Sequence, residues 1–294
     1  MARDDGLLAP LLVMSIWTDF AGSSVSFVEV AGVRTRVVQL GPQGGRPLVL
    51  LHGRGGHLET FHCNVQELAT HRRVIIFDLL GHGLSDHAGS SYDIGELRAH
   101  AVAVIEHIAG TDYDLIGQSL GGWIATLVAL ENAKVRQLVL IEPAGFQSEG
   151  ERMSDPKVRA AVEKGGRAFD TPTEADVALR FAQLLLNKES IDPEMVALRT
   201  RLYVQPGAGA VHKAVRTADN AQWLVTSENM STLSAQLLIV RGDHGHIPEA
   251  LLSSVAASAG GQLTTIPQAK QWPHYENPVA ANAVIGDFIK ETTA

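Results

Sequence analysis

Short apolar runs alternate along the chain with longer segments in which apolar residues recur every three or four positions. The runs cover residues 47–51, 74–77, 113–116, 138–141 and 237–240. Mostly apolar runs of this length are typical of strands buried on both faces, as in a parallel sheet. Two alternating stretches, 27–30 and 33–40, flank Ala31-Gly32 and predict a hairpin that opens the sheet.

The segments between these runs are predicted helices. In residues 94–108 the apolar positions form one stripe, as expected of a helix with one solvent-exposed face. Residues 120–129 are mostly apolar and predict a buried helix. Strands that alternate with helices form a parallel sheet with right-handed crossovers and helices on both faces. The pattern therefore predicts an α/β fold.

From about residue 147 to residue 232 this alternation stops, and no strong strand run occurs. The region instead contains three helix starts, each with a capping residue and a nearby proline and acidic residue. They are Asp155-Pro156, Thr171-Pro172-Thr173-Glu174 and Asp192-Pro193-Glu194. We predict a core of residues 1–146 and 233–294, with a helical cap of residues 147–232 on top of the sheet.

Composition and charge narrow the class of protein. Among 294 residues, 24 basic and 32 acidic side chains give a net charge of −8. No run of Lys or Arg exceeds two residues, so nucleic acid and anionic membranes are not expected partners. No apolar stretch reaches the ~18 residues that a membrane helix needs. The single cysteine, Cys63, excludes an internal disulfide and favours a reducing cytoplasm.

The N-terminal stretch Leu7–Trp17 is apolar, but acidic Asp4-Asp5 precede it where a signal peptide carries basic residues. We therefore expect an arm that packs on the body of the protein or on another subunit. A homodimer is compatible with such an arm, and the oligomeric state stays open.

The pentapeptide Gly117-Gln118-Ser119-Leu120-Gly121 matches G-x-S-x-G between a predicted strand and a predicted helix. The two glycines allow a sharp turn, which holds the serine above the sheet. The helix that begins there directs free N–H groups at the same place, where they stabilise an oxyanion. Ser119 is therefore the predicted nucleophile.

Several segments resemble the α/β-hydrolase superfamily in order and spacing. They are PLVLLHGRGG, VIIFDLLGHGLSD, GQSLGG, LVLIEP and QWPHYENP, and the resemblance runs from about residue 26 to residue 290. It is strongest to the capped branch with carbon–carbon bond hydrolases of ring-cleavage products, esterases and lactonases. The resemblance implies an α/β-hydrolase fold with no cofactor. Serine rather than aspartate at position 119 disfavours dehalogenase and epoxide-hydrolase chemistry.

The resemblance also implies an oxyanion hole beside Ser119. In this fold one N–H comes from the residue after the nucleophile and one from the loop after the first buried parallel strand. We assign them to Leu120 and Arg54. Other candidates to line the pocket are Gly53, His57, Gln118, Gln271 and Trp272.

The segment before the last helix departs from the family pattern. Where the family has its general-base histidine before a Trp-Pro pair, this chain has Gln271. An amide cannot accept a proton from a serine hydroxyl near neutral pH, and an unassisted serine is a poor nucleophile. His274, His244 or His246 could replace the base, or the protein could act without one.

The acidic residue that the family places beside its histidine is also not at its usual position in this sequence. The family's usual position after the strand at 237–240 falls on Gly245, and Asp243 lies two residues earlier. Glu142, directly after the strand at 138–141, is the second candidate. The sequence Asp243-His244-Gly245-His246 contains a fragment of metallohydrolase motifs, but without further ligands we expect no metal site.

We expect a small-molecule substrate with apolar or aromatic character, bound between cap and sheet. The cap offers Phe169, Phe181, Leu184, Leu185, Tyr203 and Trp223 as lining or core residues. Hydrolysis of an ester, lactone, thioester or carbon–carbon bond through Ser119 is the first hypothesis. The alternatives are a cyclase, lyase or isomerase that reuses the pocket, and a protein that binds a ligand without turnover.

Overall fold

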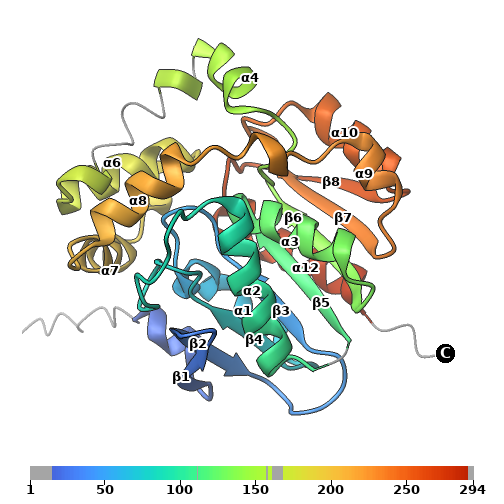
Figure 1. The fold of residues 1–294 in the computed structure, drawn as a ribbon, viewed down its shortest axis with the longest axis horizontal. Helices are drawn as coiled ribbons and strands as arrows, with labels where there is room; N and C mark the ends of the chain where they lie inside the picture. The colour runs from blue at the N-terminus through green and yellow to red at the C-terminus, as the bar shows by residue number, and fades with distance from the viewer. Residues whose placement is uncertain (1–14, 111, 157, 161–167, 291–294) are drawn as a thin grey trace, which may run out of the picture.

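The computed structural model describes residues 15–110, 112–156, 158–160 and 168–290. Figure 1 shows that a central sheet lies between helices. The strands of this eight-stranded sheet are β1 (Ser24–Val30), β2 (Val33–Leu40), β3 (Leu48–Leu51), β4 (Val74–Phe77), β5 (Tyr113–Gln118), β6 (Val135–Ile141), β7 (Gln236–Gly242) and β8 (Gln262–Ile266). Every strand expected from the sequence is present. The predicted α/β-hydrolase fold is confirmed, with an inserted helical region.

The strand order is β1-β2-β4-β3-β5-β6-β7-β8. β2 pairs antiparallel with both β1 and β4, so the predicted hairpin forms one end of the sheet. From β4 to β8 all pairs are parallel, which places the carboxyl ends of these strands along one edge. Loops from neighbouring strands therefore meet at that edge, where ligands bind in open parallel sheets.

Helices cover both faces of the sheet. The α-helices outside the inserted region are α1 (His62–Leu68), α2 (Ile94–Ile108), α3 (Leu120–Glu131), α10 (Glu249–Ser258), α11 (Pro273–Glu276) and α12 (Pro278–Ile289). Short 3-10 helices are η1 (Ile16–Phe20) and η2 (Leu58–Phe61). Alternate residues of β3 belong to opposite cores: Val49 to the core that includes residues of α2 and α3, and Leu50 to the core that includes residues of α1 and α12. This alternation explains why the strand is apolar at every position.

The segment between β6 and β7 forms the inserted helices. In Figure 1, α6, α7 and α8 lie together on one side of the molecule, α4 lies at the top, and α9 lies apart from them beside α10. They are α4 (Glu149–Ser154), α6 (Glu174–Leu184), η3 (Lys188–Ser190), α7 (Pro193–Tyr203), α8 (Ala208–Thr217), η4 (Ala221–Trp223) and α9 (Ser227–Ser231). Two predicted starts are confirmed, because Thr173 caps α6 and Asp192 caps α7. The start predicted at Asp155-Pro156 adjoins residues outside the described part.

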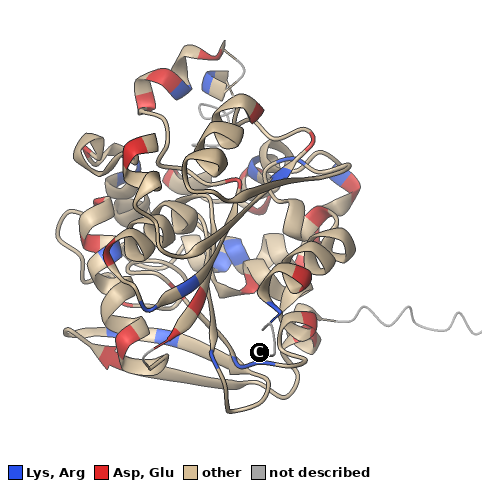
Figure 2. Ribbon diagram, turned by 90° about the vertical axis from the view of Figure 1, so that its right-hand side faces the viewer, with Lys and Arg blue, Asp and Glu red and all other residues tan. Residues whose placement is uncertain are grey.

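Charged residues of both signs are interspersed over the ribbon in Figure 2. Within the described ranges, no helix combines the length and apolar character that crossing a membrane requires. Most of the expected N-terminal arm, up to residue 14, lies outside the described residues. The described part begins beside the inserted helices, where the Ser15 hydroxyl donates to Glu194 of α7 at 2.6 Å.

Candidate active site

Ser119 occupies a sharp turn between β5 and α3. Its φ of 52° lies in the left-handed region, which is rare for residues other than glycine and marks local strain. The turn is fixed from both sides: the Ser119 N–H donates to Ile141 O, and Ser119 O accepts from the N–H of Ala144, both at 3.0 Å. A Cβ on Gly121 would lie 2.1 Å from Leu51 O, so only glycine permits this close packing.

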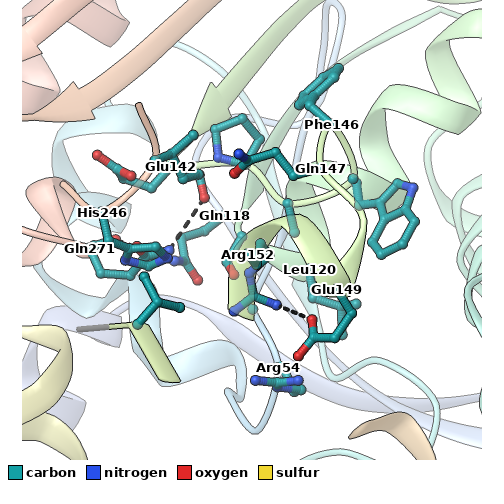
Figure 3. Close-up of a pocket in the computed structure, with 18 of the residues that line it drawn as sticks. Arg54, Gln118, Leu120, Glu142, Phe146, Gln147, Glu149, Arg152, His246 and Gln271 are labelled. Atoms are coloured by element: carbon teal, nitrogen blue, oxygen red, sulfur yellow. Dashed lines mark hydrogen bonds and ion pairs between the residues drawn. The ribbon is translucent and has the colours of Figure 1, made fainter. Parts of the chain in front are cut away.

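A cavity of about 740 Å³ opens above Ser119, between the sheet edge and the inserted helices. Core residues on its wall include Gly53, Arg54, Gln118, Leu120 and Glu142, several of which Figure 3 shows around one space. The inserted helices contribute Phe169 and Leu184. A cavity of this volume suits a small organic molecule. The other suggested cap residues, Phe181, Leu185, Tyr203 and Trp223, are not on the described cavity wall.

The loop after β3 passes close to the serine. A Cβ on Gly53 would lie 3.2 Å from the Cβ of Ser119 and 2.2 Å from Oε1 of Gln118. Arg54 follows on the cavity wall, and its carbonyl accepts a hydrogen bond from Arg180 of α6 at 3.4 Å. Leu120 is the first residue of α3, where backbone N–H groups have no intrahelical acceptor. Both residues assigned to the oxyanion hole therefore border the same cavity as Ser119.

Glu142 directly follows β6 and is fully buried on the wall of this cavity. Its Oε1 accepts the N–H of Gly242 at 2.8 Å, whereas its Oε2 has no hydrogen-bond partner. Burial raises the pKa of Glu142 to about 7, because removing the carboxylate from water disfavours its charge. The side chain lies against Gly245: a Cβ there would be 2.0 Å from Oε1 of Glu142.

Gln271 lies next to Glu142 in Figure 3 and is 4% exposed. Its Nε2 donates to the backbone carbonyl of Glu142 at 3.4 Å, and its Oε1 is buried without a partner. The Gln118 amide donates to Gln271 O, also at 3.4 Å, which ties the segment to β5. Trp272 adds an aromatic surface to the cavity wall.

Three sequence-predicted residues do not reach the cavity wall as described. His274 is fully buried behind Trp272, with its ring 5.2 Å from that of Phe61, because the turn of α11 directs it into the core. His57 hydrogen-bonds Glu59 at 2.7 Å in a buried network. The Asp243 carboxylate accepts the N–H groups of Gln268 and Ala269, which turn it away toward the loop after β8.

His244 and His246 do line the cavity, on the loop that follows β7. His246 is exposed and lines the cavity. Partial removal from water, together with the charges of Arg152 and Lys270, lowers the pKa of its imidazole below its ordinary value. No side chain within the described ranges hydrogen-bonds the Ser119 hydroxyl.

The cavity also contains cations that the sequence reasoning did not single out. Arg152 and Arg180 line it together with Arg54. Burial, followed by the charges of Arg180 and Arg152, lowers the pKa of Arg54 to about 10. Arg152 pairs with Glu149 at 2.7 Å, and Arg180 stacks on Phe169 with 4.4 Å to the ring centroid. Helix periodicity could not reveal these positions, because exposed and cavity-facing arginines give the same pattern.

Across the described residues, no group of three His, Cys, Asp or Glu side chains is placed to hold a metal ion.

Residues 48–284 match the sequence model described as the Alpha/beta hydrolase family. The chain belongs to this family. Among curated members, a 2-hydroxymuconate semialdehyde hydrolase of Pseudomonas sp. (strain CF600) is 28% identical over 278 residues, covering 91% of this chain and 94% of that protein. The dihydrolipoyllysine-residue acetyltransferase component of the acetoin cleaving system of Pseudomonas putida is 37% identical, but over 56% of this chain and 45% of that protein.

Solved structures of family members have the same fold. The meta-cleavage product hydrolase from Pseudomonas fluorescens IP01, as an S103A mutant, superposes with a TM-score of 0.78 at 21% identity, covering 91% of this chain and 98% of that one. Naproxen esterase from Bacillus subtilis gives a TM-score of 0.75 at 17% identity, covering 94% of both chains. The chain is thus a serine-hydrolase-like member of an enzyme family, and the similar proteins named here are two hydrolases, an esterase and an acetyltransferase component.

Proposed function

We propose that the protein hydrolyses an ester, lactone, thioester or activated carbon–carbon bond of a small apolar or aromatic compound through Ser119. The observation that carries the proposal is the strained turn, which presents Ser119 to an enclosed cavity beside Arg54 and Leu120. A nucleophile and two backbone donors at one point are the requirements for attack on a carbonyl carbon.

In the proposed reaction the Ser119 O–H bond breaks as its oxygen adds to the substrate carbonyl, and the N–H groups of Arg54 and Leu120 hold the oxyanion. The intermediate collapses, the bond to the leaving group breaks, and the leaving group takes up the proton that Ser119 lost. Water then adds to the acyl-serine ester, one of its protons returns to the Ser119 oxygen, and the acid is released. Phe169, Leu184 and Trp272 provide the apolar part of the substrate site. The similarity to hydrolases of ring-cleavage products makes conjugated keto acids the first compounds to test beside simple esters.

The experiment is covalent labelling with a fluorophosphonate together with hydrolysis of p-nitrophenyl esters of increasing chain length. Ser119→Ala should abolish labelling and lower hydrolysis at least ~10²-fold, as loss of a nucleophile requires. Ser253→Ala on the exposed surface of α10 is the matched control and should behave as the wild type. Folded wild-type protein that is neither labelled nor active on any ester or conjugated keto acid contradicts hydrolysis.

A second candidate is a non-hydrolytic cyclase, lyase or isomerase. The observation that favours it is Gln271 on the cavity wall, where its buried Oε1 can accept a hydrogen bond but not act as a strong base. Once a converted compound is found, Ser119→Ala separates the candidates. Full retention of turnover supports the non-hydrolytic reaction, and its loss supports hydrolysis. Tight binding without any product would instead indicate a ligand-binding protein.

A further inference from the structure

Two arginines on the wall of the cavity have no acidic partner. Arg54 lies on the loop after β3, and Arg180 lies in α6. Neither forms an ion pair within the described ranges. The other two arginines of the wall are paired, Arg152 with Glu149 at 2.7 Å and Arg216 with Asp170 at 3.8 Å. Two guanidinium charges of the cavity therefore remain without a carboxylate bonded to them.

The free guanidinium groups are accessible and held in place. Arg180 stacks on Phe169 with 4.4 Å to the ring centroid, and its Nη2 donates to the Arg54 carbonyl at 3.4 Å. Its Nη1 forms no hydrogen bond with a described residue and keeps accessible surface, whereas its Nε is buried without a partner. The three guanidinium nitrogens of Arg54 likewise have no hydrogen-bond partner among the described residues and are not buried. These N–H groups are donors that the protein itself leaves unused.

The arginines lie close enough to repel one another. After burial, the charges of Arg180 and Arg152 are the largest causes that lower the pKa of Arg54 to about 10. The charge of Arg216 acts in the same direction, and Glu149 opposes it. Figure 3 shows Arg54, Arg152 and Glu149 around the same part of the cavity. Like charges in a partly desolvated space cost free energy, which a bound anion would offset.

This group of cations begins beside Ser119. Gly53, the residue before Arg54, approaches the serine so closely that a Cβ there would lie 3.2 Å from the Ser119 Cβ. A compound whose carbonyl lies at Ser119 therefore extends along a wall that carries the Arg54 side chain. Phe169 adds an apolar ring to the same wall beneath the Arg180 guanidinium. One molecule can thus contact the serine, the ring and both guanidinium groups.

We propose that the guanidinium groups of Arg54 and Arg180 form a subsite for a doubly charged anionic group of the substrate, such as a phosphate monoester. The inference rests on the proposed function, because it specifies the compound whose carbonyl Ser119 attacks. Two unpaired cations match two negative charges, and the forked donors of arginine bind phosphate oxygens in pairs. A single carboxylate would leave one of the two cations unpaired. The substrate is then amphiphilic, with an apolar or aromatic body and an anionic end.

Binding of small aromatic probes tests the subsite without catalysis. Calorimetry at pH 8 compares phenyl phosphate, benzoate and benzyl alcohol, which carry about two, one and no negative charges. The wild-type protein should bind phenyl phosphate at least ~10-fold more tightly than benzoate, because the second charge pairs with the second guanidinium. Arg180→Met keeps an unbranched side chain over Phe169, and it should reduce the preference for phenyl phosphate over benzyl alcohol ~10-fold or more. Arg54→Met, which retains the backbone N–H, should have the same effect.

Arg201→Met is the matched control, because it removes the same charge from the exposed surface of α7. Its preference among the three probes should equal that of the wild type. The inference is overturned if Arg201→Met weakens phenyl phosphate binding as much as Arg180→Met does. Equal affinity of the wild type for phenyl phosphate and benzoate would overturn the assignment of a doubly charged group.

Hydrolysis of p-nitrophenyl esters of matched length connects the subsite to turnover. The 4-phosphonobutyrate ester should have a kcat/KM at least ~10-fold above that of the neutral valerate ester, and Arg180→Met should remove this preference. Protein that hydrolyses all such esters without an anion preference refutes this inference alone. Protein that binds phenyl phosphate through Arg180 but is neither labelled at Ser119 nor hydrolytic refutes the proposed function and leaves the anion subsite in place.

Discussion

At the scale of single residues, Gln271 determines which hydrogen bonds and proton transfers this part of the cavity wall can support. Its side chain lies on the cavity wall between Glu142 and Trp272, where it can donate and accept hydrogen bonds but not hold an extra proton. A histidine at this position would place an imidazole on the wall of the cavity that Ser119 also borders.

Gln271→His should raise the rate of Ser119 labelling at pH 7.5 by ~10²-fold, because a positioned imidazole contributes that much as a general base. The measurement is the labelling rate, followed by intact-mass spectrometry. Gln183→His, which also adds an imidazole to the cavity wall, is the control and should give less than a ~5-fold change. Equal effects of both variants would show that position 271 has no special relation to Ser119.

Residue identity alone could not rank the candidate acids and bases. Five candidates, Ser119, Arg54, Leu120, Glu142 and Gln271, do line one cavity, and the glycine-rich turns and strand ends of the sequence determine where the backbone carries them. It could not show that Asp243 is held by the N–H groups of Gln268 and Ala269. The direction of a side chain on a loop depends on such distant partners, which leave no periodic signal.

At the scale of elements, a buried ionic network joins β2, η2 and the loop after β4. Arg36 donates to both oxygens of Glu59 at 2.8 and 2.9 Å and to Asp78 at 2.6 Å. His57 donates to Glu59, and Arg199 of α7 donates to His57 Nε2 at 3.2 Å. The network therefore links α7 of the inserted helices to the segment that follows the loop after β3.

Arg36→Met should lower the free energy of unfolding by about 3–5 kcal/mol, because it leaves two buried carboxylates without their cation. Urea denaturation at pH 7 measures the change. The control is Arg34→Met on the same strand, whose guanidinium is exposed and stacks on Phe27, and it should cost only about 0.5–1 kcal/mol. A similar cost for both variants would mean that the network contributes no more than a surface cation.

The strands and helices themselves were largely predictable. Continuous apolar runs identified the central strands because both of their faces are covered, and capping residues identified the starts of α6 and α7. The inward direction of His274 was not predictable. It depends on α11 beginning at Pro273, a four-residue helix too short to show an apolar stripe.

For the molecule as a whole, the buried histidines determine the response to acid. Burial lowers the pKa of each of six: His52, His57, His82, His100, His212 and His274. Two of them accept hydrogen bonds from the loop after β4, since Leu79 N–H donates to His52 and Leu80 N–H donates to His100. Protonating these nitrogens removes the hydrogen bonds that hold the loop after β4.

Stability should therefore fall as the pH drops from 6.5 toward 4. The unfolded histidines take up protons near pH 6.5, whereas His82 and His100 do so only near pH 4 when folded, so acid favours the unfolded chain. Each such histidine contributes up to about 1.4 kcal/mol per pH unit. Glu142 acts in the opposite direction between its ordinary pKa and about 7, because the unfolded carboxyl loses its proton first.

Urea midpoints between pH 7 and pH 5 test this expectation. His100→Gln should reduce the slope of stability against pH, while His107→Gln on the exposed side of α2 should leave it unchanged. A flat profile in the wild-type protein would contradict the prediction.

The pairing of β5 with β6 has one more consequence. Ser119 and Glu142 are each one residue beyond a bonded pair of central strands, while the covering helices belong to a separate insertion. The strand pairing that sets the spacing between the Ser119 and Glu142 backbones therefore does not involve the inserted helices. Substitutions in those helices that change the shape of the cavity should leave this spacing unchanged.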